Sequence, residues 1–292
     1  MEPSSFRWAG VAGLLLASLA AQAPAPVTLL PRYTAGQRLT YSVEIRSVIS
    51  SGAVLDTTAQ AELRILSSTG PGAFTAAARF LHYATTVQAS PQDQAALQKQ
   101  SAATDHAAVS MAPAEFAVAP GSFKTVSRQA GAAYDQPVEM LEELARTDSL
   151  PAGPAKVGAA WTRTRTRAIP TLNVSVPLRL DCALTAIAPY AGQPAATIVV
   201  HATGGAALPP DALPGSKQLA AQGLVAEASV QFDTTATSHY RLSDGVLLET
   251  SSTSHNHLHV NLVGPSPAAR STDSEIRSTS TVKLETEPRP LT

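Results

Sequence analysis

Apolar and polar residues alternate over much of the chain. In QRLTYSVEIR (37–46) the apolar positions are Leu39, Tyr41, Val43 and Ile45. In LNVSVPLRLDCALTA (172–186) every second residue from Leu172 to Leu184 is apolar. A period of two places alternate side chains on the same face of an extended strand. The pattern therefore predicts antiparallel strands with one buried face and one solvated face.

Turn residues separate these strands, as at Ser51-Gly52, Gly70-Pro71-Gly72 and Asp244-Gly245. Two stretches, 91–109 and 136–147, instead contain good helix formers, and each has a proline near its start. The sequence thus predicts a mainly β protein. We expect a curved antiparallel sheet, either open or a half barrel, made of two similar meanders with one or two covering helices.

An internal echo supports the two meanders. YTAGQRLTYSVE (33–44) and AKVGAAWTRTRT (155–166) both place a glycine shortly before a strand that holds an aromatic residue. We interpret 27–292 as a single antiparallel β domain with two pseudo-repeats, about 33–90 and 155–286, joined by a helical segment, 91–150. Two independent domains are the alternative.

The first residues resemble an export signal. A basic residue precedes an apolar run from Trp8 to Ala21, and small residues follow it. Cleavage after Ala20 or after Ala23 fits the small-x-small pattern, and Pro24 favours the first. We predict a signal peptide within 1–23 and a periplasmic or extracellular protein. An uncleaved anchor is the alternative, although the run is short for crossing a bilayer.

Composition narrows the choice of partners. The 292 residues carry 21 Lys and Arg against 22 Asp and Glu, a net charge of −1. This balance gives no basic surface for nucleic acid, so we expect no nucleic-acid partner. The one cysteine, Cys182, lies within an apolar row, which indicates a buried and unreactive thiol.

Catalytic motifs are missing from the sequence. It has no G-x-S-x-G elbow, glycine-rich phosphate loop or H-E-x-x-H helix. We therefore expect a protein that is not an enzyme and needs no cofactor; a hydrolase with a dispersed site ranks last. WTRTRTR aligns Arg163, Arg165 and Arg167 with Trp161, either as an anion clamp or as a solvated face paired with acidic neighbours. The neutral composition favours the second interpretation.

The stretch SHNHLHVNL (254–262) places His255, His257 and His259 at alternate positions. Their imidazoles project from one face, opposite Leu258 and its apolar neighbours. Two imidazoles at i and i+2 with a facing carboxylate could hold zinc or copper. The alternative is a solvent-facing surface without metal.

The preceding turn suggests which carboxylate faces these histidines. With Ser243-Asp244-Gly245 as a three-residue hairpin loop and Gly245 left-handed, the numbers of paired residues sum to about 488. This register matches apolar residues to apolar residues and sets Asp233 opposite His255. Asp233 thereby joins the three histidines as a candidate metal ligand.

Several phrases together resemble a known group of proteins. AGQRLTY, LPAGPAKVGAAW and FDTTATSHYRLSDGVLLET are similar to segments of uncharacterised exported bacterial proteins in which P-x-x-x-V-G-x-x-W opens the second half. Those proteins resemble the periplasmic lipoprotein-carrier half barrel, in which helices plug the mouth of a curved sheet. The resemblance implies an apolar groove and brings no catalytic residues.

We therefore expect an exported binding or structural protein that holds a lipid-like or apolar ligand, or a lipoprotein partner, in its concave sheet. The alternative is a metal-binding β protein that uses the histidine strand. Sequence alone leaves open the oligomeric state and whether the concave face is a filled core or a cavity.

Overall fold

The structure is a computed structural model, and it describes residues 25–169, 174–213, 215–264 and 270–286. In this part of the chain eleven strands form one sheet, in the order β5-β4-β3-β2-β1-β11-β10-β9-β8-β7-β6. The strands are β1 (Arg38–Ile49), β2 (Val54–Gly70), β3 (Ala73–Gln88), β4 (Ala114–Ala119), β5 (Ser122–Ser127), β6 (Ala160–Ile169), β7 (Val174–Tyr190), β8 (Gln193–Leu208), β9 (Val225–Arg241), β10 (Leu247–Val263) and β11 (Arg270–Thr286). The helices are α1 (Pro91–Ser110), α2 (Ala132–Ala145) and α3 (Ser216–Ala221).

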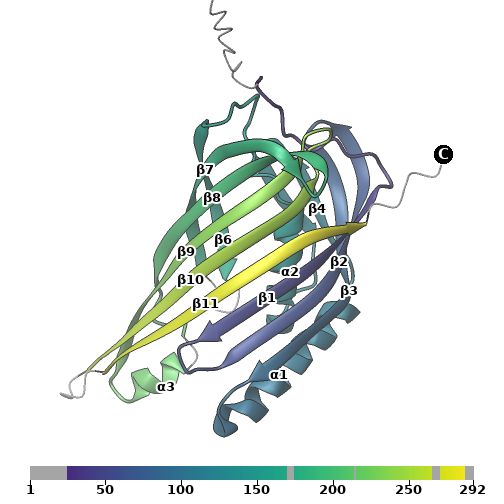
Figure 1. Cartoon of the computed structure of the whole chain (residues 1–292). Helices are drawn as coiled ribbons and strands as arrows, with labels where there is room; N and C mark the ends of the chain where they lie inside the picture. Colours follow the sequence, from purple (N-terminus) through teal and green to yellow (C-terminus); the bar gives the residue numbers. More distant parts are fainter. Residues whose placement is uncertain (1–24, 170–173, 214, 265–269, 287–292) are drawn as a thin grey trace, which may run out of the picture.

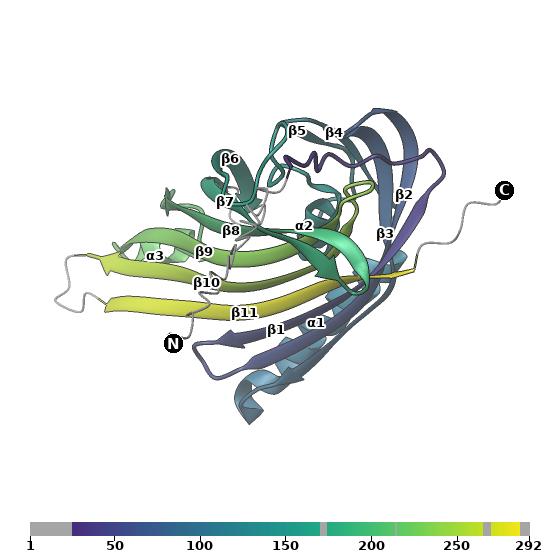
Figure 2. The same ribbon diagram turned by 45° about the horizontal axis from the view of Figure 1, so that its top comes forward.

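Two meanders make up the sheet. Strands β1 to β5 follow one another outward on one side, and β6 to β11 run inward from the opposite edge. The meanders join where β1 pairs with β11, and every neighbouring pair is antiparallel. Strands β5 and β6 are the edges, so the sheet stays open as it curls around α2 (Figures 1 and 2). The predicted curved antiparallel sheet is confirmed.

The alternating pattern becomes an alternation of burial. In β1, Leu39, Tyr41 and Val43 are at most 3% exposed, whereas the residues between them lie on the outer face. In β7 the apolar row from Val176 to Leu184 is buried in the same way. The concave face is therefore the apolar face, as a half-buried antiparallel sheet requires.

The connection between the meanders is only partly helical, so the prediction of a helical segment over 91–150 is incomplete. Strands β4 and β5 form a hairpin between α1 and α2. Its inward residues Ala114, Phe116 and Val118 are buried, but so short an alternation between helix formers gives a weak signal. Helix α2 also begins at Ala132, before Pro137.

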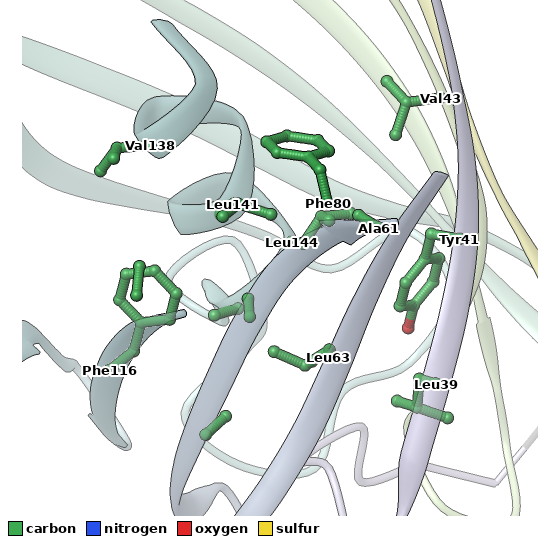
Figure 3. Packing of buried hydrophobic residues seen from close by; sticks show 14 of the residues in the cluster. Leu39, Tyr41, Val43, Ala61, Leu63, Phe80, Phe116, Val138, Leu141 and Leu144 are labelled. Carbon is green, nitrogen blue, oxygen red and sulfur yellow. The ribbon is translucent and has the colours of Figure 1, made fainter. Parts of the chain in front are cut away.

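Helix α2 completes the largest core cluster. Its Val138, Leu141 and Leu144 pack against the inner faces of β1 to β4, and Leu141 is 0% exposed (Figure 3). Met111, just after α1, joins the same cluster. Smaller clusters lie under the N-terminal segment and near α3.

The V-G-x-x-W phrase forms the loop that leads into β6. Gly158 has φ +87°, and its N–H donates to the Leu184 carbonyl at 2.8 Å. Nε1 of Trp161 donates to the Ser149 carbonyl at 3.2 Å. Val27 makes an antiparallel bridge with Ala155. The phrase therefore fastens both the N-terminal segment and the start of the second meander to the sheet.

The predicted signal peptide, 1–23, lies outside the described residues. Among the described helices, none is long and apolar enough to cross a membrane. Export and the division into two pseudo-repeats stay predictions.

We predict that Leu141→Ala lowers the free energy of unfolding by about 2–5 kcal/mol, because it leaves a cavity where α2 meets the sheet. Leu66→Ala is the matched control: Leu66 is 42% exposed on the outer face of β2, so its loss should cost less than about 0.5 kcal/mol. Urea denaturation measures both values. Equal losses would contradict the role assigned to α2.

Candidate functional site

A groove of about 720 Å³ lies on the concave side of the sheet, next to α2. The inner faces of β9, β10 and β11 form its floor, and α2 with the edge strands β5 and β6 forms its roof. This volume is within the range of roughly 300–1,000 Å³ that is common for ligand pockets. Helix α2 thus fills one half of the concave side and leaves the other half partly open.

The floor is mainly apolar. Paired residues of antiparallel neighbours share a face, so Phe232, Asn256 and Ile276 form one row across β9, β10 and β11. Val230 and Leu258 lie in the next row. Val230 and Phe232 are buried in a core cluster, whereas Ile276 is 37% exposed although it points to the concave side. The floor is therefore open at its β11 side.

Asn256 is the polar member of this floor. Its Oδ1 is buried and has no hydrogen-bond partner among the described residues. An unsatisfied buried acceptor costs about 1–3 kcal/mol. A ligand that donates a hydrogen bond here would remove that cost.

The roof consists of ion pairs between α2 and β6. Arg165 lies 3.0 Å from Glu143, and Arg167 lies 2.6 Å from Glu139. The side chains of Arg165 and Arg167 are 19% and 29% exposed. The preferred interpretation of WTRTRTR is therefore right about the acidic partners of these two arginines and wrong about the solvated face, because the curl of the sheet turns them toward the helix.

Arg167 also reaches the floor. Its Cζ lies 4.5 Å from the centroid of the Phe232 ring, a cation–π distance. At the other end of the roof, Cζ of Arg146 lies 4.1 Å from the Phe123 ring. The two contacts brace α2 and both edges of the sheet around the groove.

Burial and charge act in opposite directions in the roof. Partial burial raises the pKa of Glu139, while Arg167 opposes the shift and Glu143 adds to it. Burial alone would lower the pKa of Arg165, but the carboxylates of Glu143 and Asp148 raise it above its ordinary value. Arg165 therefore stays charged and compensates the acidic groups beside it.

Hydroxyl groups line the concave face between the core clusters. Ser47 and Ser278 lie 2.8 Å apart, and so do Ser252 and Ser280. These pairs satisfy each other across neighbouring strands. Because these inward positions are serines, the strands show no alternation of apolar and polar residues here, and the sequence does not indicate which face points inward.

The histidine strand has the register predicted from its sequence. His255 pairs with Asp233, His257 with Gln231, and all three histidines lie on the outer face. The predicted loop length is wrong, although Gly245 is left-handed as predicted, with φ +69°. Arg241 donates its N–H to the Val246 carbonyl, which makes a four-residue loop, and a bulge between Leu247 and Glu249 restores the register.

The nearest carboxylates of this strand come from β11. Oδ1 of Asp273 lies 2.7 Å from Nδ1 of His259 and 3.4 Å from Nε2 of His257. His255 lies 3.7 Å from Glu275. Asp233 instead lies 3.1 Å from Nε2 of His201 on β8. The register predicted from the sequence concerned only β9 and β10. It could not show that residues of β11, which pairs with the other side of β10, lie beside the histidines.

The outer cluster is exposed, and its histidines contact the carboxylates of Asp273 and Glu275. The contact with His259, followed by the charge of His257, lowers the pKa of Asp273. Within the described residues, no group of three or more His, Cys, Asp or Glu side chains is arranged to hold a metal ion. Zinc or copper would therefore require these side chains to leave their present contacts.

Cys182 is buried on the inner face of β7, as the sequence predicts. Burial raises its pKa to about 11, so the thiolate is scarce at neutral pH. Among the described residues, Cys182 packs within a core cluster.

Fold and groove together define an open, curled antiparallel sheet with an amphipathic concave site. No protein-family model and no curated protein matches the chain. A structure concerning lipid–protein interactions in lipovitellin is 11% identical, with a TM-score of 0.44, and covers 88% of this chain. The match takes in 26% of the lipovitellin chain, so this protein spans about a quarter of that length. An outer membrane channel from Pseudomonas putida F1 is 7% identical, with a TM-score of 0.23, over 88% of this chain and 98% of its own.

We predict that Arg167→Met raises the pKa of Glu139 further, because Arg167 has the largest effect among the groups that lower this pKa. Carboxyl carbon shifts followed by NMR against pH measure the change, and Glu139→Gln identifies the resonance by its loss. An unchanged pKa would show that the ion pair is unimportant in solution.

The raised pKa also fixes the sign of a stability change. The folded protein keeps the proton of Glu139 at pH values where the unfolded chain has lost it. The free energy of unfolding should therefore fall as pH rises from the ordinary pKa of glutamate, about 4.3, to the raised value. Urea denaturation of Glu139→Gln should lack this component.

Metal binding by the histidine strand stays a prediction, and Asp273 now replaces Asp233 as its expected carboxylate. We predict that Asp273→Asn weakens Zn²⁺ binding by about tenfold or more, while Asp233→Asn changes it little. Isothermal titration with ZnCl₂ measures both. If a variant carrying His257→Ala and His259→Ala binds Zn²⁺ as the wild type does, this strand is not the site.

Proposed function

We propose that the protein binds a lipid-like ligand in the groove between α2 and strands β9 to β11, and that it does so as an exported, non-enzymatic binding protein. The observation that carries the proposal is the exposure of Ile276 on the concave side, within a cavity large enough for a ligand. An apolar residue left open at this depth gains free energy when an apolar group covers it.

The distribution of apolar and charged residues around the groove favours an amphiphile over a wholly apolar molecule. Val230, Phe232, Leu258 and Ile276 offer an apolar floor. The opposite wall carries the ion pairs of Glu139 and Glu143, which need water or a polar group beside them. A ligand with one apolar part and one polar end matches both walls.

Fixed walls support binding without a large rearrangement. The floor is held by strand pairing on both sides of β10, and the roof is anchored by the buried face of α2. A preformed site avoids much of the ordering cost of binding. A lipoprotein that presents its acyl chain to the same groove is compatible with this geometry.

We predict that Ile276→Asp weakens binding of the neutral fluorescent probe N-phenyl-1-naphthylamine by at least about tenfold, because it places a charge on the apolar floor. Val48→Asp is the matched control, since Val48 is 40% exposed and Ile276 is 37% exposed. Val48 pairs with Arg277 on the outer face, so its replacement should change affinity less than about twofold.

Fluorescence titration of delipidated protein measures these affinities, and circular dichroism checks that both variants fold. Absence of probe binding to the wild type would refute the proposed site, as would equal effects of the two substitutions. Native mass spectrometry of protein from its own host should also show a co-purified lipid.

A further inference from the structure

We propose that the polar end of the ligand is uncharged, as in a long-chain alcohol or a monoacylglycerol; this inference rests on the function proposed above. Two features of the groove carry it. One is the balance of charges in the roof, and the other is the unpartnered acceptor in the floor.

The charged groups that line the groove cancel. Four arginines and four carboxylates contribute to its wall. The arginines are Arg128, Arg146, Arg165 and Arg167, and the carboxylates are Asp135, Glu139, Glu142 and Glu143. The groove therefore has no net charge to compensate a charged ligand.

Most of these charges are already engaged. Arg165 and Arg167 pair with Glu143 and Glu139, and Arg146 lies 3.4 Å from Glu142. Arg128 is exposed and has no ion pair among the described residues. An anionic head group that binds Arg146, Arg165 or Arg167 would have to displace one carboxylate from its arginine. The displaced carboxylate would then lie beside a second anion in a partly buried site, which is costly.

The state of Glu139 points the same way. Burial already raises the pKa of this carboxyl despite its arginine partner. A further negative charge nearby would oppose its ionisation more strongly. A cationic head group meets the equivalent difficulty, because it would compete with the guanidinium groups that now hold the carboxylates.

The floor offers a neutral contact instead. Oδ1 of Asn256 is buried without a partner among the described residues, between Phe232 and Ile276 in the same row. A hydroxyl group can donate to this oxygen, whereas an ionised carboxylate can only accept. Nε of Arg146 and Nε of Arg167, in the roof, lie near carboxylates but also lack a hydrogen-bond partner within the described part of the chain. A hydroxyl group, which can both donate and accept, therefore suits the floor and the roof together.

Competition between ligands of equal chain length tests the inference. Oleyl alcohol, oleate and oleylammonium would each displace N-phenyl-1-naphthylamine from the wild type at pH 7.4, at concentrations at which they stay monomeric. We expect oleyl alcohol to displace the probe at a concentration at least about tenfold lower than either ion. Equal potency of the alcohol and an ion, or a preference for an ion, would overturn the inference.

Two variants assign the preference to the named residues. Asn256→Leu should weaken oleyl alcohol binding about threefold to tenfold, the loss of one hydrogen bond, while the probe still binds. Glu139→Gln leaves Arg167 uncompensated and should shift the preference toward oleate. If neither variant changes the ratio between the potencies of oleyl alcohol and oleate, the inference is wrong. Probe binding that is sensitive to Ile276→Asp would still support the proposed function in that case.

Discussion

The pairing of β1 with β11 is the interaction on which the rest of the structure depends. It joins strands from opposite ends of the described chain, from Thr40 with Thr286 to Ile49 with Ile276. Without it each meander would be a separate sheet with another unpaired edge. With it the strands form one sheet wide enough to curl, and its apolar face turns inward (Figure 2). Such distant strands pay a loop-closure cost that hydrogen bonding and burial must offset.

Helix α2 determines how much of the concave side is core and how much is groove. One face of the helix, with Val138 and Leu141, is buried against β1 to β4. The other face directs Glu139 and Glu143 toward the arginines of β6. A short helix with these two faces covers only one half of the curved sheet. The uncovered half leaves Ile276 of its apolar floor within reach of solvent, and ion pairs hold the edge strand β6 over it.

Strand β10 shows how alternation separates two possible functions on one segment. Its odd positions from His255 to His259 lie on the outer face beside Asp273 and Glu275. Its even positions, Asn256 and Leu258, face the groove. The histidines are conspicuous in the sequence because histidine is rare in this chain. Asn256 and Leu258 are of common residue types and do not stand out in the sequence. Their place in the groove depends on the helix and strand that lie opposite them.

The sequence by itself determined the strands, their buried faces and even the pairing of β9 with β10, because these follow from alternation and local turn chemistry. It also indicated the helix formers around Leu141 and the buried Cys182. Tertiary structure alone decided that Arg165 meets α2 instead of water, that Asp273 lies beside the histidines, and that Asn256 faces a groove. The contacts of Arg165 and Asn256 join segments far apart in the chain, and they come together through the curl of the sheet, which no local pattern encodes. Asp273 is 14 residues from His259, and the pairing of β10 with β11 places it there.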